Sequence, residues 1–220
     1  MGYSHYYKFR TDYKISSLKW KEIVDDFNKI LDVEIDIPRN DLYSGTEGLT
    51  RLRSILEPDS DQRLEITDNE IRFNGREEGD RGHETFSIQR MSDERLKVYA
   101  KRLERDYIFD SCKTARKPYD IVVCCLLVIL KYHLGNMIEV SSDGADWTND
   151  EGVYYEIDGS WSDAIKLCAE NLSYDLNYDD LHKHLFDECV LEEDVLEEDK
   201  AFGVIGNDGR IGNSGVYLSL

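Results

Sequence analysis

The stretch whose side chains are best suited to bind or react is CKTARKPYD at residues 112–120. It leads directly into a block of apolar residues. Three cations, Lys113, Arg116 and Lys117, stand just ahead of Pro118, a residue favoured at the first position of a helix. A helix N-terminus already carries roughly half a positive charge. Added cations there indicate that an anion is held at this end, or that acidic side chains fold over it. We therefore interpret the stretch as a candidate anion site.

Lysine and arginine donors beside the free amides of a helix start suit a phosphate or a carboxylate. The hydroxyl of Thr114 would add a donor, and Tyr7 or Tyr119 could supply an aromatic wall. The chain lacks the Walker spacing of glycines before Lys and Ser or Thr, so an ATPase of that kind is not supported. The predicted ligand-binding residues are Lys113, Thr114, Arg116, Lys117, Tyr119, Asp120, Glu84, Asp143 and His5.

Two other interpretations of these charged residues stay open. In one, the cations only pair with Asp106, Asp110 or Asp120 in a surface network. In the other, Asp110, Asp120, Asp143 and Glu84 surround a hard cation such as magnesium or calcium. We assign no metal site, because Asp143 followed by glycine is more typical of a tight turn. The sequence names no cofactor.

Histidines and cysteines offer fewer possibilities. His5 and His83 could meet across a sheet and cleave a phosphodiester, but the His-x-Ser/Thr repeat of two-histidine phosphoesterases is missing, and local hydrogen bonding is the favoured role. Cys112 lies among cations that could lower its pKa, although no His–Asp pair beside it supports a cysteine hydrolase. Cys124 and Cys125 are expected to pack in the core. His182 and His184 make a weak metal pair.

Hydrophobic periodicity places these residues on a small set of elements. It predicts strands at 3–10, 64–66, 71–73, 82–88 and 137–141, and helices that start at Ser17 and span 93–107, 118–134 and 160–172. Residues 32–61 are irregular. The order predicts an α+β fold, a mainly antiparallel sheet with helices packed on it in a split βαβ arrangement. Residues 1–172 would form the core domain, and 173–220 an acidic, partly helical appendage with a glycine-rich end.

Composition limits the partners and the compartment. The 220-residue chain has a formal net charge of −19, which opposes binding to duplex nucleic acid or to an anionic membrane. Its longest apolar block is about ten residues, against the roughly 20 that a membrane helix needs. It has five cysteines, an odd number, and no Cys-x-x-Cys spacing. This pattern indicates reduced thiols, as expected in the cytosol. We expect a soluble, cytoplasmic protein.

Several short segments together resemble a family of proteins from phages, bacteria and fungi. They are MGYSHYY at 1–7, FNG at 73–75, ETF at 84–86, CKTARKPYD at 112–120 and SDG at 142–144. The resemblance covers roughly the first 172 residues and leaves the acidic appendage outside. It implies no reaction, cofactor or catalytic residue, and for a viral member it implies the host cytoplasm.

Three functions follow in order of preference. The first is a binding protein that holds an anionic small molecule such as a nucleotide, as a phage protein sequestering a host defence signal would. The second is an acidic interaction or inhibitor protein that occupies a basic site on a protein partner and mimics nucleic acid, through residues 175–199. The third is an enzyme acting on phosphorylated substrates. The sequence leaves the oligomeric state open.

Overall fold

The fold is α+β, as predicted, in a computed structural model that describes residues 2–37, 48–148, 154–157 and 159–174. The helices are α1 (Ser17–Leu31), α2 (Glu94–Arg102), α3 (Asp120–Leu134) and α4 (Gly159–Asn171), with short 3-10 turns at Leu52–Ile55 and Gly135–Met137. The strands are β1 (Ser4–Arg10), β2 (Glu34–Ile37), β3 (Gly48–Arg51), β4 (Glu65–Ile66), β5 (Glu70–Phe73), β6 (Phe86–Gln89), β7 (Tyr107–Lys113), β8 (Ile138–Ser142), β9 (Ala145–Thr148) and β10 (Tyr154–Ile157).

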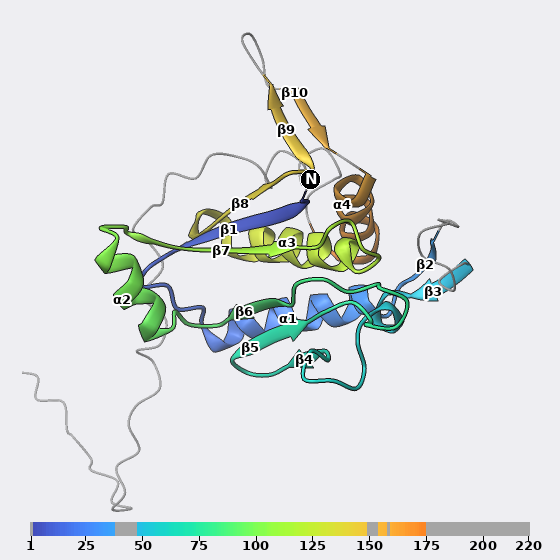
Figure 1. Cartoon of the computed structure of the whole chain (residues 1–220), viewed down its shortest axis with the longest axis horizontal. Helices are drawn as coiled ribbons and strands as arrows, with labels where there is room; N and C mark the ends of the chain where they lie inside the picture. Colours follow the sequence, from blue (N-terminus) through green and yellow to red (C-terminus); the bar gives the residue numbers. More distant parts are fainter. Residues whose placement is uncertain (1, 38–47, 149–153, 158, 175–220) are drawn as a thin grey trace, which may run out of the picture.

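A three-stranded sheet in the order β7-β1-β8 positions the candidate site (Figure 1). The central strand β1 runs antiparallel to both neighbours, with Ser4 opposite Lys113 and His5 opposite Ser142. The outer strands β7 and β8 are therefore parallel to each other, and α3 connects them. A parallel strand pair joined by a helix, with another strand inserted between, is the split βαβ arrangement predicted above.

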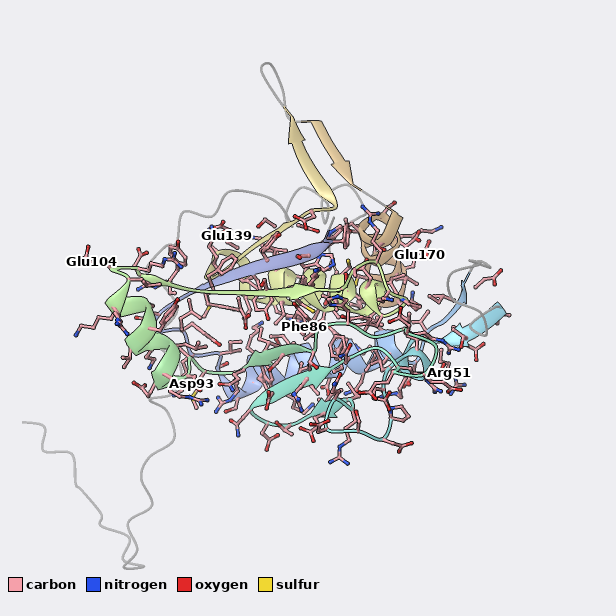
Figure 2. All side chains as sticks on the ribbon, in the orientation of Figure 1. Arg51, Phe86, Asp93, Glu104, Glu139 and Glu170 are labelled. Carbon is pink, nitrogen blue, oxygen red and sulfur yellow. The ribbon has the colours of Figure 1, made fainter. Side chains whose placement is uncertain are left out.

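A second three-stranded sheet, in the order β4-β5-β6, covers α1 (Figure 1). Aromatic rings connect the sheets through the core. Phe86 lies 5.4 Å from both Tyr7 of β1 and Phe73 of β5, measured between ring centroids, and Phe73 lies 5.6 Å from Phe27 of α1. Figure 2 shows Phe86 between the sheets, whereas Glu104 and Glu170 lie at the surface. The pairs β2–β3 and β9–β10 form two further antiparallel ribbons.

Helix α3 is the centre of the core. It is apolar on every face, and Val122 through Leu130 are all buried. Helices α1 and α4 and strand β8 pack around it. Residues 120–137 are apolar and long enough to cross a membrane by composition, but most of this stretch is buried inside the fold, which is typical of the core helix of a soluble protein.

A polar contact joins α1 to the last turn of α3. Ser16 caps the start of α1, with its hydroxyl accepting from the backbone N–H of Lys19. Further along, the nearly buried carboxylate of Asp26 lies 2.9 Å from Nε2 of His133 and 2.7 Å from Nζ of Lys29. Burial raises the pKa of Asp26, but hydrogen bonds from Lys29, His133 and Tyr174 outweigh it, so the pKa is lowered overall.

The sequence predictions differ from the structure at several places in the described residues. The helix predicted at 93–107 ends at Arg102, and the strand predicted at 82–88 begins at Phe86. Strand β7 was not predicted, because only Ile108 and Cys112 are buried along it and Asp110 interrupts the alternation. The β9–β10 ribbon was assigned to a loop. The central helix begins at Asp120 rather than Pro118, since the N–H of Asp120 closes a turn on the carbonyl of Lys117. The acidic appendage was expected at 173–220, and all of it after Tyr174, including His182, His184 and the glycine-rich end, lies outside the described residues.

Asp26 gives a pH-dependent prediction. Its pKa in the fold is below its ordinary value of 3.8, so its stabilising contribution is present above that value and is lost as the pH falls through the lowered pKa. Asp26→Asn should lower the free energy of unfolding at pH 7 by about 1.5 kcal/mol and flatten its decline below pH 4. Urea unfolding between pH 2.5 and 7 measures both. Asp25→Asn, an exposed neighbour, should keep the wild-type slope; an equal flattening there would contradict the assignment.

Candidate functional site

Short segments from four distant parts of the sequence meet near the start of α3. The carbonyl of Tyr3 accepts hydrogen bonds of 3.1 Å from the backbone N–H groups of both Thr114 and Ala115. On one side, the Glu84 carboxylate accepts from the N–H of Lys113 at 2.6 Å. On the other side, the Asp143 carboxylate accepts from the N–H of Ser4 at 2.9 Å. Residues far apart in the sequence therefore form one hydrogen-bonded unit.

A strained turn lies at the centre of this unit. Ala115 and Arg116 have φ angles of 52° and 57°, and the N–H of Lys117 bonds back to the carbonyl of Thr114 at 3.0 Å. Two consecutive residues of positive φ make a type I′ turn, which glycine or asparagine normally occupies. The left-handed conformation costs about 1–2 kcal/mol for each ordinary residue. Such strain persists where the surrounding structure enforces it, and it is concentrated at functional sites.

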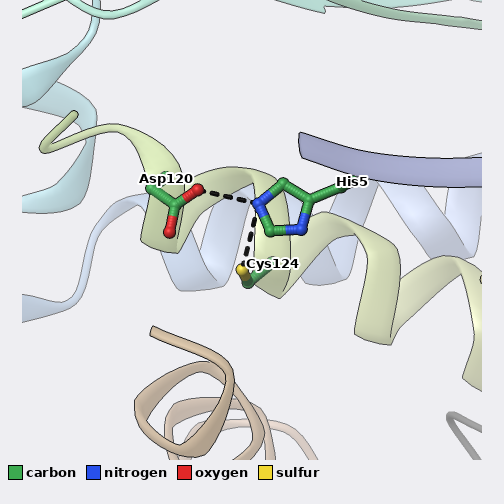
Figure 3. A group of neighbouring side chains, drawn as sticks. All are labelled: His5, Asp120 and Cys124. Carbon is green, nitrogen blue, oxygen red and sulfur yellow. Dashed lines mark hydrogen bonds and ion pairs between the residues drawn. The ribbon is translucent and has the colours of Figure 1, made fainter. Parts of the chain in front are cut away.

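Beneath the turn lies a buried polar cluster around His5, which is fully buried (Figure 3). Its Nε2 lies 2.7 Å from Oδ1 of Asp120 and 3.8 Å from Sγ of Cys124. Its Nδ1 lies 2.9 Å from the hydroxyl of Ser142, which also accepts from the N–H of Gly144 at 3.0 Å. The His5 ring therefore has a polar partner at each nitrogen and a fixed orientation.

Asp120 is the negative charge at the start of α3. Burial raises its pKa, but hydrogen bonds and charge from His5, with further hydrogen bonds from Thr114 and Ser160, outweigh burial and lower the pKa below its ordinary value. Oδ1 receives both His5 and Thr114, whereas the buried Oδ2 has no well-formed hydrogen bond in the described structure. A carboxylate in the first turn also interacts favourably with the helix dipole. The anion indicated by the sequence is thus supplied, at least in part, by the chain itself.

The three cations go to different partners. Lys117 donates to Asp80, at 2.6 Å to Oδ2 and 2.8 Å to the carbonyl, and this ion pair replaces the pairings with Asp106, Asp110 or Asp120 that the sequence allowed. The guanidinium of Arg116 lies 4.1 Å from the ring centroid of Tyr3, in a cation–π contact. The Lys113 side chain lies over Gly2, and a Cβ added to Gly2 would lie 2.9 Å from Cε of Lys113. Lys113 makes no ion pair within the described part of the chain.

The structure separates the acidic residues that the hard-metal interpretation would gather. Asp120 is buried in the cluster, whereas Glu84 and Asp143 are exposed and hold backbone amides on opposite sides of Ser4 and Lys113. Asp110 lies farther along β7, opposite Tyr7. Tyr119, predicted as a ligand wall, is buried and donates its hydroxyl to the carbonyl of Glu84 at 2.7 Å.

The loop from Gly75 to Gly82 closes the unit from the side of β5. The buried side chain of Asn74 accepts from the N–H groups of Gly75 and His83, at 2.7 and 3.2 Å, and donates to the carbonyl of His83 at 3.0 Å. Gly75 is needed for close approach, since a Cβ there would lie 2.2 Å from the carbonyl oxygen of Arg81 and 2.6 Å from the Tyr119 ring. This explains why FNG precedes the loop.

Two possibilities that the sequence raised for reactive groups are not met in the structure, and His5 has the hydrogen-bonded role that was favoured for it. Burial, together with the charges of Glu84, Asp120 and Asp110, raises the pKa of the Cys112 thiol to about 12 despite a hydrogen bond with Tyr119, so the nearby cations do not activate it. His83 is exposed in the loop and does not join His5, which is fully buried between Asp120 and Ser142.

Sequence reasoning missed three members of the buried cluster. Cys124 was assigned to core packing, although its spacing of four from Asp120 places both on one helix face. Ser142 was seen only as part of a turn. Trp161 of α4 packs edge-on against the His5 ring at 5.2 Å between centroids, and no sequence pattern connects it with His5.

Comparison of the chain with protein-family models, with curated proteins and with solved structures finds no match. The functional argument therefore depends on the geometry described above.

The close packing at Gly75 can be tested by substitution. Gly75→Ala should lower the free energy of unfolding by about 1–3 kcal/mol, because the added methyl group must displace the backbone of Arg81. Gly159→Ala is the control, since an added Cβ there meets no atom within 4 Å. Denaturant unfolding of both variants provides the measurement, and an equal effect at the two positions would contradict the close-approach explanation.

A substitution in the strained turn should not lower the free energy of unfolding as Gly75→Ala does. Ala115→Gly should leave stability unchanged or raise it by up to about 1 kcal/mol, because relief of the left-handed strain exceeds the added entropy of the unfolded chain. Ala100→Gly, in the interior of α2, should instead destabilise by about 1 kcal/mol. Thermal unfolding distinguishes the two. A loss of stability at Ala115 equal to that at Ala100 would show that the turn is not strained.

Proposed function

We propose that the protein binds an anionic small molecule, a nucleotide or another phosphorylated ligand, on the surface formed by Lys113 and Arg116 over Gly2 and Tyr3. The observation that carries this proposal is the placement of the two cations. Arg116 stacks on Tyr3, and Lys113 runs across the preceding residue, Gly2. Two positive side chains thus converge on adjacent residues at one end of the β7-β1-β8 sheet.

The backbone favours a fixed arrangement of these cations. Arg116 is one of the two left-handed residues of the turn, and the turn is held to β1 by two hydrogen bonds to the carbonyl of Tyr3. A cation held in advance loses less conformational entropy when it binds a ligand. A guanidinium supplies paired donors for phosphate oxygens, and a lysine ammonium adds a point charge. The exposed carboxylates of Glu84 and Asp143 lie on opposite sides of this surface. They would repel a highly charged anion that is large enough to approach both of them.

A competing location for an anion lies near α2. An open hollow of about 490 Å³ is lined by Lys97, Lys101 and Arg105. Its other charged lining residues are Asp12, Glu104 and Asp106, so positive and negative side chains balance there. Lys113 has no such acidic ion-pair partner in the described residues. The α2 hollow therefore serves as the matched control for the proposed site.

Thermal shift of the purified protein against nucleotides, cyclic oligonucleotides and phosphosugars tests the proposal. A ligand at one hundred times its dissociation constant adds about 2.7 kcal/mol to stability. The double variant Lys113→Glu, Arg116→Glu should lose the shift, with affinity reduced at least tenfold. The control Lys97→Glu, Lys101→Glu should keep it. Loss in the control alone would move the site to α2, and the absence of any shift across the panel would overturn the proposal.

A protein partner is the second candidate, and charge distribution favours it. Of the 46 acidic residues, twelve lie after residue 174, together with only three of the 27 basic residues. Such a segment suits a basic site on a partner by charge complementarity. Neutralising Glu192, Glu193 and Asp194 to the matching amides in the full chain should abolish partner capture and leave any nucleotide-induced thermal shift unchanged.

A further inference from the structure

We propose that His5, Asp120 and Cys124 form a binding site for a divalent transition metal, with Zn²⁺ the best-fitting ion. The three side chains offer an imidazole nitrogen, a carboxylate oxygen and a thiolate sulfur. Zinc binds all three ligand types, and this mixed set does not suit magnesium or calcium, which take oxygen ligands. The site differs in position and in chemistry from the anion surface proposed above.

The ligand atoms already lie close enough to share one ion. All three are within 4.8 Å of one another, and Figure 3 shows the side chains pointing toward a common centre. Ligands at zinc bond lengths in a tetrahedral site stand roughly 3.3–3.8 Å apart. The 3.8 Å from His5 Nε2 to Cys124 Sγ matches this separation. The distance of 2.7 Å between His5 Nε2 and Asp120 Oδ1 must increase by less than about 1 Å for both atoms to bind one ion. A small rotation of the Asp120 carboxylate supplies this increase.

Surrounding hydrogen bonds orient the ligands as they do in metal sites. The far nitrogen of His5, Nδ1, bonds the Ser142 hydroxyl, and the Thr114 hydroxyl donates to the Asp120 carboxylate. A proton on Nδ1 leaves the lone pair of Nε2 directed at the other two ligands. Partners of this kind fix the tautomer of a ligating histidine and orient ligating carboxylates.

Charge balance favours the ion in so buried a place. His5 and Cys124 are fully inaccessible and Asp120 is 2% exposed, and Oδ2 of Asp120 has no well-formed hydrogen bond among the described residues. One thiolate, one carboxylate and one neutral imidazole carry two negative charges, which a divalent ion cancels. Binding releases to solvent the Cys124 thiol proton and the Nε2 proton of the His5–Asp120 hydrogen bond, and it leaves His5 neutral with its proton on Nδ1. A buried group whose charges cancel has a far smaller desolvation cost than one that carries a net charge.

Cobalt(II) titration of the full, untagged, chelator-treated chain is the direct test. We expect one Co²⁺ per chain, with the near-ultraviolet thiolate-to-cobalt band and the visible bands of a tetrahedral site, both displaced by Zn²⁺. Metal analysis of the protein as purified should find zinc near one equivalent. An absence of both the bands and bound zinc would overturn the proposal.

Adjacent cysteines on α3 supply a matched pair of variants. Cys124→Ser should abolish the thiolate band and weaken Co²⁺ binding at least a hundredfold, whereas Cys125→Ser, also buried but outside the cluster, should keep both. Far-ultraviolet circular dichroism confirms that each variant folds. Should Cys124→Ser fail to fold, Ser142→Ala provides the second test, with the band kept and affinity lowered about 10–100-fold.

Two outcomes separate this site from alternatives. Persistence of the thiolate band in a folded Cys124→Ser variant would place the metal on other cysteines and overturn the proposal. The Lys113→Glu, Arg116→Glu variant should bind Co²⁺ as the wild type does, so failure of the anion-binding proposal leaves this one intact.

Discussion

The pairing of His5 with Asp120 is the interaction on which the arrangement of this protein depends. It joins the central strand of the main sheet to the first residue of the most buried helix, at 2.7 Å and almost without solvent contact. A buried carboxylate is tolerated only when hydrogen bonds and charge replace its hydration. Neighbouring elements supply these partners: Thr114, which follows β7, donates to Asp120, Ser160 in the first turn of α4 interacts with the same carboxylate, and Ser142 at the end of β8 holds the His5 ring.

The strained turn follows from the same constraint. Thr114 must direct its hydroxyl inward to Asp120 while its N–H bonds to Tyr3, and only five residues separate it from the first turn of α3. The chain therefore reverses within Ala115 and Arg116, both in the left-handed conformation. The loop held by Asn74 then packs against Tyr119 and supplies Asp80 to Lys117, which keeps the reversed segment in place.

The sequence predicted the parts of the fold that depend on local pattern and not those that depend on pairing. Helix α1 was predicted from its capping serine and its apolar face, and the buried character of α3 from its continuous hydrophobicity. Strand β7 was not predicted, because Asp110, opposite Tyr7, breaks the apolar alternation that marks a strand. The interpretation of Arg116 as an anion ligand beside a helix start omitted the turn, since positive φ at alanine and arginine leaves no compositional sign.

The same distinction explains what could be known of the candidate site. His5, Thr114 and Asp120 were named from the sequence, and the structure brings them together in one buried cluster. Cys124 and Ser142 join them only through the strand order β7-β1-β8, which places His5 opposite Ser142 and over one face of α3. No single-sequence pattern fixes that order, because it arises when a parallel pair is split by an inserted strand.

Thr114 is the residue through which the buried cluster and the surface act on each other. Its hydroxyl bonds Asp120, its N–H bonds Tyr3, and its carbonyl receives Lys117, while Lys113 precedes it and the reversed turn follows. Any change of charge or of ligand at Asp120 must alter the hydrogen bond that Thr114 donates, and the turn has little freedom to absorb a shift because its φ angles are already strained. The turn that carries Lys113 and Arg116 is therefore held in place through Thr114 by a carboxylate in the core.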